Sequence, residues 1–141
     1  MTTTQPQQGK VIPFGYAGNG GMARLRKLMQ EEKAVIVDIR LAPFSKWQRD
    51  FNKRALQKQF GKRYIHMPEL GNLHYQVQHR HLGIQLARQE QGIERLKKGL
   101  AKGYTIILMC ACKNKACHRW TVISLLKEAF PDVEVSGEPQ F

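Results

Sequence analysis

Three cysteines lie within eight positions of one another, in the segment Cys110-Ala-Cys-Lys-Asn-Lys-Ala-Cys-His-Arg. The segment follows an apolar run and precedes one with helical periodicity, so we expect a basic turn that enters a helix. The amides at a helix N-terminus attract anions and favour a thiolate over a thiol. The segment therefore predicts an anion loop in which Cys117 is a nucleophile and His118 its acid/base partner. Cys112 and Arg119 would bind the ligand there.

Two other interpretations of this segment stay open. Cys112, Cys117 and His118 are suitable zinc ligands, although no Cys-x-x-Cys pair is present. Cysteine is also a common small apolar core residue, and Cys110 fits that role best. We predict no cofactor, with zinc as the alternative.

Charged residues of a second kind follow other apolar runs. Asp38 and Arg40 are two positions apart, so their side chains share one side of an extended segment. They would act as a base and an anion ligand in a catalytic site, or as an ion pair in a structural one. Glu69, just after Pro68, is a second candidate catalytic carboxylate, and its alternative is a solvated loop position.

A basic stretch interleaved with aromatic residues follows Pro43. It contains Trp47 and Phe51, and such mixtures suit phosphate contact and base stacking. The alternative is a solvated helix face whose aromatic residues point into the core. The predicted nucleic-acid-binding residues are Lys46, Arg49, Lys53 and Arg54.

The whole chain is strongly basic. It has 23 Lys and Arg against 11 Asp and Glu, a net charge of +12, which favours an anionic partner such as a nucleotide or nucleic acid. No apolar run is long enough to span a bilayer, and the polar start is no secretory signal, so we expect a cytoplasmic protein without a membrane partner. Its thiols would be reduced there, and three clustered cysteines do not resemble a disulfide framework. The oligomeric state stays open.

The remaining pattern predicts one α/β domain, residues 11–141, after a disordered tail, residues 1–10. Apolar runs indicate strands at 11–17, 34–39, 64–67, 104–110 and 133–135. Helical periodicity indicates helices at 21–32, 47–60, 84 or 85 to 102, and 117 or 118 to 130. This alternation is typical of a three-layer sandwich with a mostly parallel sheet of about five strands and helices on both faces.

Ligands of such sheets bind beyond the carboxyl ends of the strands. Four predicted strands end in polar or reactive residues: Gly15 and Tyr16, Asp38 and Arg40, His66 and Glu69, and the segment 110–119. We therefore expect these residues to meet at one edge of the sheet.

The ordered set of short motifs resembles domain-of-unknown-function family 488 over roughly residues 11–136. The motifs are Gly15-Tyr, Val37-Asp-Ile-Arg, Pro43 with Ser45, Tyr64-Ile-His-Met-Pro-Glu-Leu-Gly and Cys117-His-Arg. The resemblance implies a compact α/β domain and a shared site without naming a reaction. That site would comprise Gly15, Tyr16, Asp38, Arg40, Glu69, Gly71, Cys117, His118 and Arg119. Within it, Gly15, Tyr16, Arg40 and Gly71 would contact the ligand. This sequence has Cys112 where many relatives carry an acidic residue.

The leading hypothesis is an enzyme of unknown reaction class that acts on a phosphorylated, nucleotide or nucleic-acid ligand through the Cys-His-Arg loop. The first alternative is a non-catalytic nucleic-acid-binding or adaptor module that uses the basic stretch. The second is a small zinc or thiol-redox protein.

Overall fold

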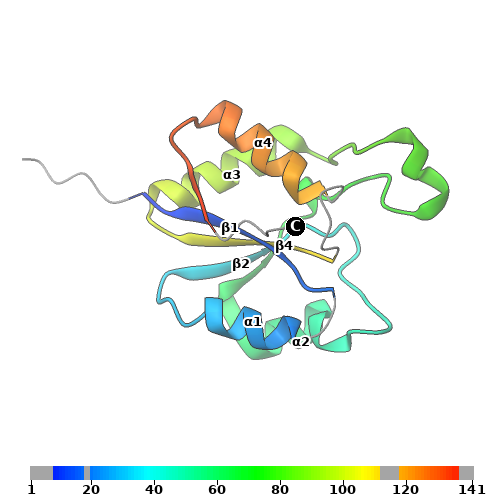
Figure 1. Ribbon diagram of the computed structural model, residues 1–141, viewed down its shortest axis with the longest axis horizontal. Helices are drawn as coiled ribbons and strands as arrows, with labels where there is room; N and C mark the ends of the chain where they lie inside the picture. Colours follow the sequence, from blue (N-terminus) through cyan, green and yellow to red (C-terminus); the bar gives the residue numbers. More distant parts are fainter. Residues whose placement is uncertain (1–7, 18–19, 112–117, 137–141) are drawn as a thin grey trace, which may run out of the picture.

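The computed structural model describes residues 8–17, 20–111 and 118–136, and within them a three-layer α/β sandwich (Figure 1). Five strands form one sheet in the order β3-β2-β4-β1-β5, and each neighbouring pair is parallel. The strands are β1 (Lys10–Gly15), β2 (Ala34–Asp38), β3 (Tyr64–His66), β4 (Thr105–Cys110) and β5 (Glu134–Val135). The predicted fold class is confirmed.

Four helices cover the two faces of the sheet: α1 (Gly21–Leu28), α2 (Lys53–Phe60), α3 (Gln89–Ala101) and α4 (His118–Ala129). In Figure 1, α1 and α2 lie on one face and α3 and α4 on the other. Right-handed crossovers explain this division. The connections from β1 to β2 and from β2 to β3 run toward the β3 edge of the sheet, and those from β3 to β4 and from β4 to β5 run toward the β5 edge. Connections that run in opposite directions place their helices on opposite faces.

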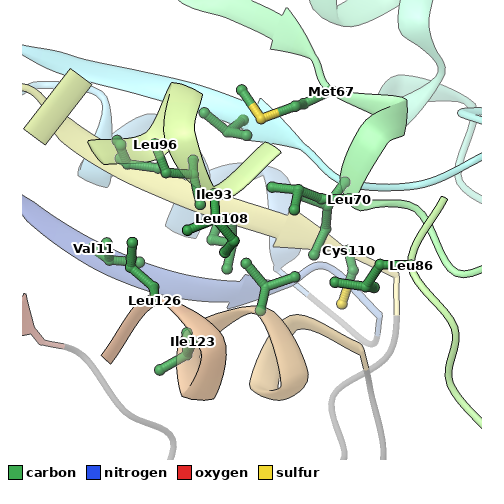
Figure 2. Close-up of a cluster of buried hydrophobic side chains, with 14 of the residues drawn as sticks. Val11, Met67, Leu70, Leu86, Ile93, Leu96, Leu108, Cys110, Ile123 and Leu126 are labelled. Carbon is green, nitrogen blue, oxygen red and sulfur yellow. The ribbon is translucent and has the colours of Figure 1, made fainter. Parts of the chain in front are cut away.

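Each face of the sheet has its own apolar core. One core joins β1 and β4 to the inner sides of α3 and α4, where Leu96, Leu108 and Leu126 meet (Figure 2). The other lies under α1 and α2 and includes Phe14, Leu25 and Phe51. β4 is buried along its whole length, as its continuous apolar run predicts for a central parallel strand.

The expected helix over 47–60 is two shorter pieces. A 3-10 turn, Arg49–Phe51, precedes α2, and Asn52 between them has extended backbone angles. The Asn52 side chain accepts a hydrogen bond from the Ser45 amide at 2.6 Å, and the Lys53 amide donates to the Pro43 carbonyl at 3.1 Å. These contacts fasten the preceding loop to the start of α2, so a continuous helix is excluded.

Other helix and strand ends also differ from prediction. α1 ends at Leu28, earlier than expected, and α3 begins at Gln89 rather than Ile84 or Gln85. Leu86, predicted on the face of α3, instead forms an antiparallel bridge with Asn72 and is still buried. Apolar periodicity identifies buried positions without showing that they belong to one helix.

Three further 3-10 helices occupy connections: Gly61–Arg63, Pro68–Leu70 and Val77–Leu82. The chain enters β1 at Lys10, and the Gly9 amide donates to the Leu100 carbonyl at 2.8 Å, so these two residues are tied to the domain. The first seven residues of the predicted tail lie outside the described part of the chain. No helix of the described residues is long and apolar enough to cross a membrane.

Candidate functional site

The sheet register brings the four predicted strand ends into one row. Gly15 is paired with Cys110, and Asp38 is paired with His66 on one side and Met109 on the other. The connections that follow β2 and β4 leave in opposite directions, which is the arrangement that opens a binding crevice in an α/β sheet. The ends of these four strands therefore lie side by side at one edge of the sheet, as predicted.

Asp38 and Arg40 form a bidentate ion pair at this edge. Arg40 Nε donates to Asp38 Oδ1 at 2.8 Å and Nη2 donates to Oδ2 at 2.6 Å. The Arg40 backbone amide donates to Oδ1 as well, at 3.1 Å. Asp38 is 0% exposed and Arg40 is 6% exposed, so the pair lies in the protein interior.

Two tyrosine hydroxyls and a backbone carbonyl make further hydrogen bonds with this pair. Tyr64 donates its hydroxyl to Asp38 Oδ2 at 2.5 Å, while Arg40 donates to the Tyr16 hydroxyl at 3.0 Å and to the Phe51 carbonyl at 2.6 Å. The Tyr16 ring stacks on Phe51 with centroids 4.3 Å apart. Burial and the charge of Asp38 raise the pKa of Tyr64 well above its ordinary value. Tyr64 therefore stays a hydrogen-bond donor.

This geometry favours the structural interpretation of Asp38 and Arg40. Burial alone would lower the pKa of Arg40, but the hydrogen bond and charge of Asp38 raise it above its ordinary value, so the guanidinium is permanently charged. The buried network joins the ends of β1 and β2, the start of β3 and the 3-10 turn before α2. Sequence reasoning missed Tyr64, because only the register beside β2 brings its hydroxyl to the carboxylate.

Two histidines fasten the turn after β2. His118 Nε2 lies 2.8 Å from the Ile39 carbonyl and His66 Nε2 lies 2.8 Å from the Arg40 carbonyl. A carbonyl only accepts, so both Nε2 atoms carry the proton. Burial lowers the pKa of His118, aided by the positive charge of Arg119 and opposed by the Ile39 hydrogen bond and the charge of Asp38. His118 is therefore neutral near pH 7 and placed at the crevice.

Arg119 does not face solvent. It is 2% exposed, its Nη1 donates to the sulfur of Cys110 at 3.0 Å, and its guanidinium lies 5.3 Å from the Trp120 ring centroid. Cys110 is buried in the core, as expected. Its sulfur is disulfide-bonded, so the expectation of reduced thiols is wrong for this residue.

Glu69 pairs with Arg95, a residue of α3 that sequence reasoning missed. Arg95 Nη1 lies 2.5 Å from Glu69 Oε2. Burial would raise the pKa of Glu69, but the hydrogen bond from Arg95, the Glu69 backbone amide and the charges of Arg95 and Arg88 lower it. Glu69 is thus an ionised carboxylate turned to α3, and no contact joins it to Asp38 or Arg40 among the described residues.

Of the two predicted glycines, Gly71 has a packing role. A Cβ on Gly71 would lie 2.9 Å from the Leu41 Cα atom, so the chain after β3 passes too close to the chain after β2 for a side chain. The Gly15 carbonyl accepts a weak hydrogen bond from Arg24 at 3.4 Å. Their predicted ligand roles stay predictions.

Cys112 and Cys117 lie outside the described residues, so their predicted roles stay predictions. The zinc alternative depends on the same two residues. The described residues contain no group of three His, Cys, Asp or Glu side chains that could hold a metal ion.

A polar cleft of about 800 Å³ opens between the start of α1 and the segment that follows Pro43. Its walls include Lys46 and Arg49, both exposed, and Trp47, which is 92% exposed. Asp50 is the only acidic residue of the lining, and Phe51 closes the inner end as a buried side chain. The two aromatic residues of the basic stretch thus differ in environment: Phe51 belongs to the core, and Trp47 lies at the surface.

The start of α1 forms the opposite wall of this cleft through Gly20, Gly21, Met22 and Ala23. Gly20 has φ of 75°, a left-handed conformation that favours glycine, and it caps the helix without a side chain. The amides of Met22 and Ala23 make no hydrogen bond within the described residues, and the first turn has no acidic residue. Sequence reasoning predicted α1 but missed this amide end as a site. The glycine-rich start of the helix was the available signal.

Lys53 and Arg54 are exposed on the first turn of α2 but do not line the cleft. The structure therefore brings together Lys46 and Arg49 of the four predicted nucleic-acid-binding residues. Lys53 and Arg54 could contact only a ligand that extends beyond the cleft.

A family model described as domain of unknown function DUF488 matches residues 23–126, more than half of the chain. No curated protein and no solved structure matches the chain. The comparison thus covers most of α1, α2, the strands β2, β3 and β4, α3 and most of α4, and it assigns no activity.

Proposed function

The chain belongs to the DUF488 family, and we propose that it binds a nucleotide or a nucleic acid in the cleft between α1 and the segment 46–51. The observation that carries the proposal is the composition of this cleft. Lys46, Arg49 and the amides of Met22 and Ala23, which make no hydrogen bond to the described residues, suit a phosphate. The exposed indole of Trp47 suits a base.

The charge of the chain supports this proposal. A net charge of +12 draws polyanions to the molecule and speeds their association. A hydrophobic side chain as exposed as Trp47 has little to gain from its position in the folded protein alone. Stacking on a base contributes about 1–3 kcal/mol per aromatic side chain, which gives that exposure a physical reason.

The test is the anisotropy of a labelled short oligouridylate titrated with protein, alongside competition by AMP, ribose 5-phosphate and inorganic phosphate. Lys46→Ala/Arg49→Ala should weaken binding at least about tenfold and reduce the salt slope by about 0.7 for each lost phosphate contact. Trp47→Ala should weaken the binding of the oligonucleotide and of AMP but leave the binding of ribose 5-phosphate unchanged.

The matched control is Arg26→Ala/Lys27→Ala, which removes two exposed cations from the last turn of α1. If it weakens binding as much as Lys46→Ala/Arg49→Ala, the attraction is general and the cleft is not the site. Competition by AMP distinguishes a nucleotide from a longer nucleic acid, which should need contacts beyond one base.

A second candidate function is catalysis at the crevice between β2 and β4. Its support is His118, which is neutral, sits at the crevice and could accept a proton from Cys117 as the nucleophile. Asp38 would supply negative charge nearby.

Turnover of a panel of nucleotides and phosphate esters, measured under reductant, tests this candidate. Cys117→Ser should abolish turnover while oligonucleotide binding persists, and Cys112→Ser is the control. Turnover that survives in Cys117→Ser would exclude this cysteine as the nucleophile.

A further inference from the structure

A second hollow, which we call the α3 groove, lies on the opposite face of the sheet from the cleft. Its volume is about 480 Å³. Its floor is apolar and comes from three strands and the residue after β3: Val35, Val37, Ile65, Met67 and Ile106. Leu96 and Gly99 of α3 form one wall. Met67 and Leu96, both labelled in Figure 2, belong to the buried core beneath α3.

The groove exists because the helix layer on this face is narrower than the sheet. A parallel sheet is normally covered on both faces. Here α3 and α4 pack against each other and against β4, so the β2 and β3 side of the sheet is left partly open. Val35 and Ile65 are accordingly only half-buried, although neighbouring Ile36 and Val37 are buried.

Cations surround this apolar floor. The lining includes Lys62, Arg63, Arg95, Lys98 and Lys102, and it includes no acidic residue. Two of these are occupied within the protein: Arg63 donates to the Ala34, Met29 and Glu31 carbonyls, and Arg95 pairs with Glu69.

The three lysines of the rim are different. The side chains of Lys62, Lys98 and Lys102 are exposed and make no hydrogen bond or ion pair with the described residues. Lys98 and Lys102 lie at the C-terminal end of α3, where a cation is favourable in any case. That effect explains why these two residues are positively charged. It does not explain why they border an apolar hollow that Lys62 borders as well.

We propose that the α3 groove binds a small amphipathic anion, with an aliphatic or aromatic body on the sheet and a carboxylate, sulfonate or phosphate at the lysine rim. The volume lies within the range of small-molecule sites. The apolar floor and the cationic rim together select a ligand that has both an apolar body and an anionic group.

The test uses octanoate as the probe, followed by the methyl resonances of the protein. Octanoate should shift the methyl signals of Val35, Ile65 and Ile106, while acetate should not because it lacks the apolar body. Octyltrimethylammonium, with a similar chain and the opposite charge, should bind at least about fivefold more weakly. Lys98→Glu/Lys102→Glu should weaken octanoate binding by a similar factor.

The matched control is Lys27→Glu/Lys58→Glu, which makes the same charge change at exposed positions on the α1 and α2 face. Equal binding of the anion and the cation, equal weakening in both double variants, or shifts confined to other methyl groups would overturn the proposal. The same spectra report folding, and if the double variant is unfolded, Lys62→Glu takes its place with the same expected direction.

Discussion

At the scale of single residues, the centre of the molecule is a buried charge network rather than an exposed site. Asp38 receives hydrogen bonds from Arg40 and Tyr64, and Arg40 reaches Tyr16 and the Phe51 carbonyl. Removing one member of a buried ion pair leaves an uncompensated charge in the interior. The network therefore ties the ends of β1 and β2 to the start of β3, and its loss should lower the stability of the protein first.

Asp38→Asn should reduce the free energy of unfolding by about 3–5 kcal/mol, because the Arg40 guanidinium would lose its counter-charge. Urea unfolding followed by circular dichroism measures the change. Asp50→Asn is the control, since Asp50 is exposed, and it should change the stability by less than about 0.5 kcal/mol. A stable Asp38→Asn protein would contradict the structural role and return Asp38 to the candidate catalytic bases.

His118 should give the protein a pH-dependent stability. Burial lowers its pKa in the folded state, so below about pH 6.5 the unfolded chain binds a proton that the folded chain does not. Stability from this residue is thus present at neutral pH and is lost on acidification, by at most about 1.4 kcal/mol per pH unit.

His118→Gln should flatten this dependence, because the Gln amide can still donate to the Ile39 carbonyl but does not titrate. The measurement is urea unfolding at about pH 7.5 and about pH 5.5, between which His118 changes its protonation in the unfolded chain. An unchanged loss of stability in the variant would show that another group is responsible.

At the scale of elements, α3 illustrates how one helix can have two glycines with opposite requirements. A Cβ added at Gly92 would clash with the buried side chain of Leu70, whereas one added at Gly99 would lie in ordinary contact with Ile106, at 3.4 Å. Gly92 is therefore needed for the close approach of α3 to the 3-10 helix Pro68–Leu70, and Gly99 is not needed for packing.

Gly92→Ala should lower the free energy of unfolding by about 1–3 kcal/mol through overpacking, despite the better helix propensity of alanine. Gly99→Ala should raise it by up to about 1 kcal/mol, because alanine favours the helix and meets no obstacle. Thermal unfolding of the two variants side by side checks both signs. Equal effects at the two positions would contradict the packing described for α3.

At the scale of the whole molecule, the excess of positive charge acts on stability as well as on binding. Twenty-three basic residues against 11 acidic ones repel one another in the compact state. The ion pairs among described residues are few, and the one between Asp38 and Arg40 is buried and hence weakly screened.

Raising NaCl from about 0.05 M to about 0.5 M should therefore raise Tm by about 2–6 °C, as repulsion is screened while the buried pair is spared. Differential scanning calorimetry across the salt series measures the shift. A Tm that falls with salt would mean that exposed ion pairs outweigh the repulsion.

The sequence alone was sufficient for the fold, because strand and helix patterns are local. The alternation of apolar runs with helical periodicity predicted the parallel sheet, both helix layers and the edge where the strand ends meet. Boundaries were less certain where a side chain such as Asn52 bonds to a distant part of the chain, since no local pattern records that contact.

The tertiary structure alone decided which polar residues are exposed. Arg119 and Arg40 look like ligand-binding cations in the sequence, yet burial and their partners Cys110 and Asp38 turn them inward. Lys46 and Trp47 remain at the surface beside the start of α1. A residue type and its spacing determine what chemistry a side chain is capable of. Register and packing, which involve residues far apart in the chain, determine whether a ligand can reach it.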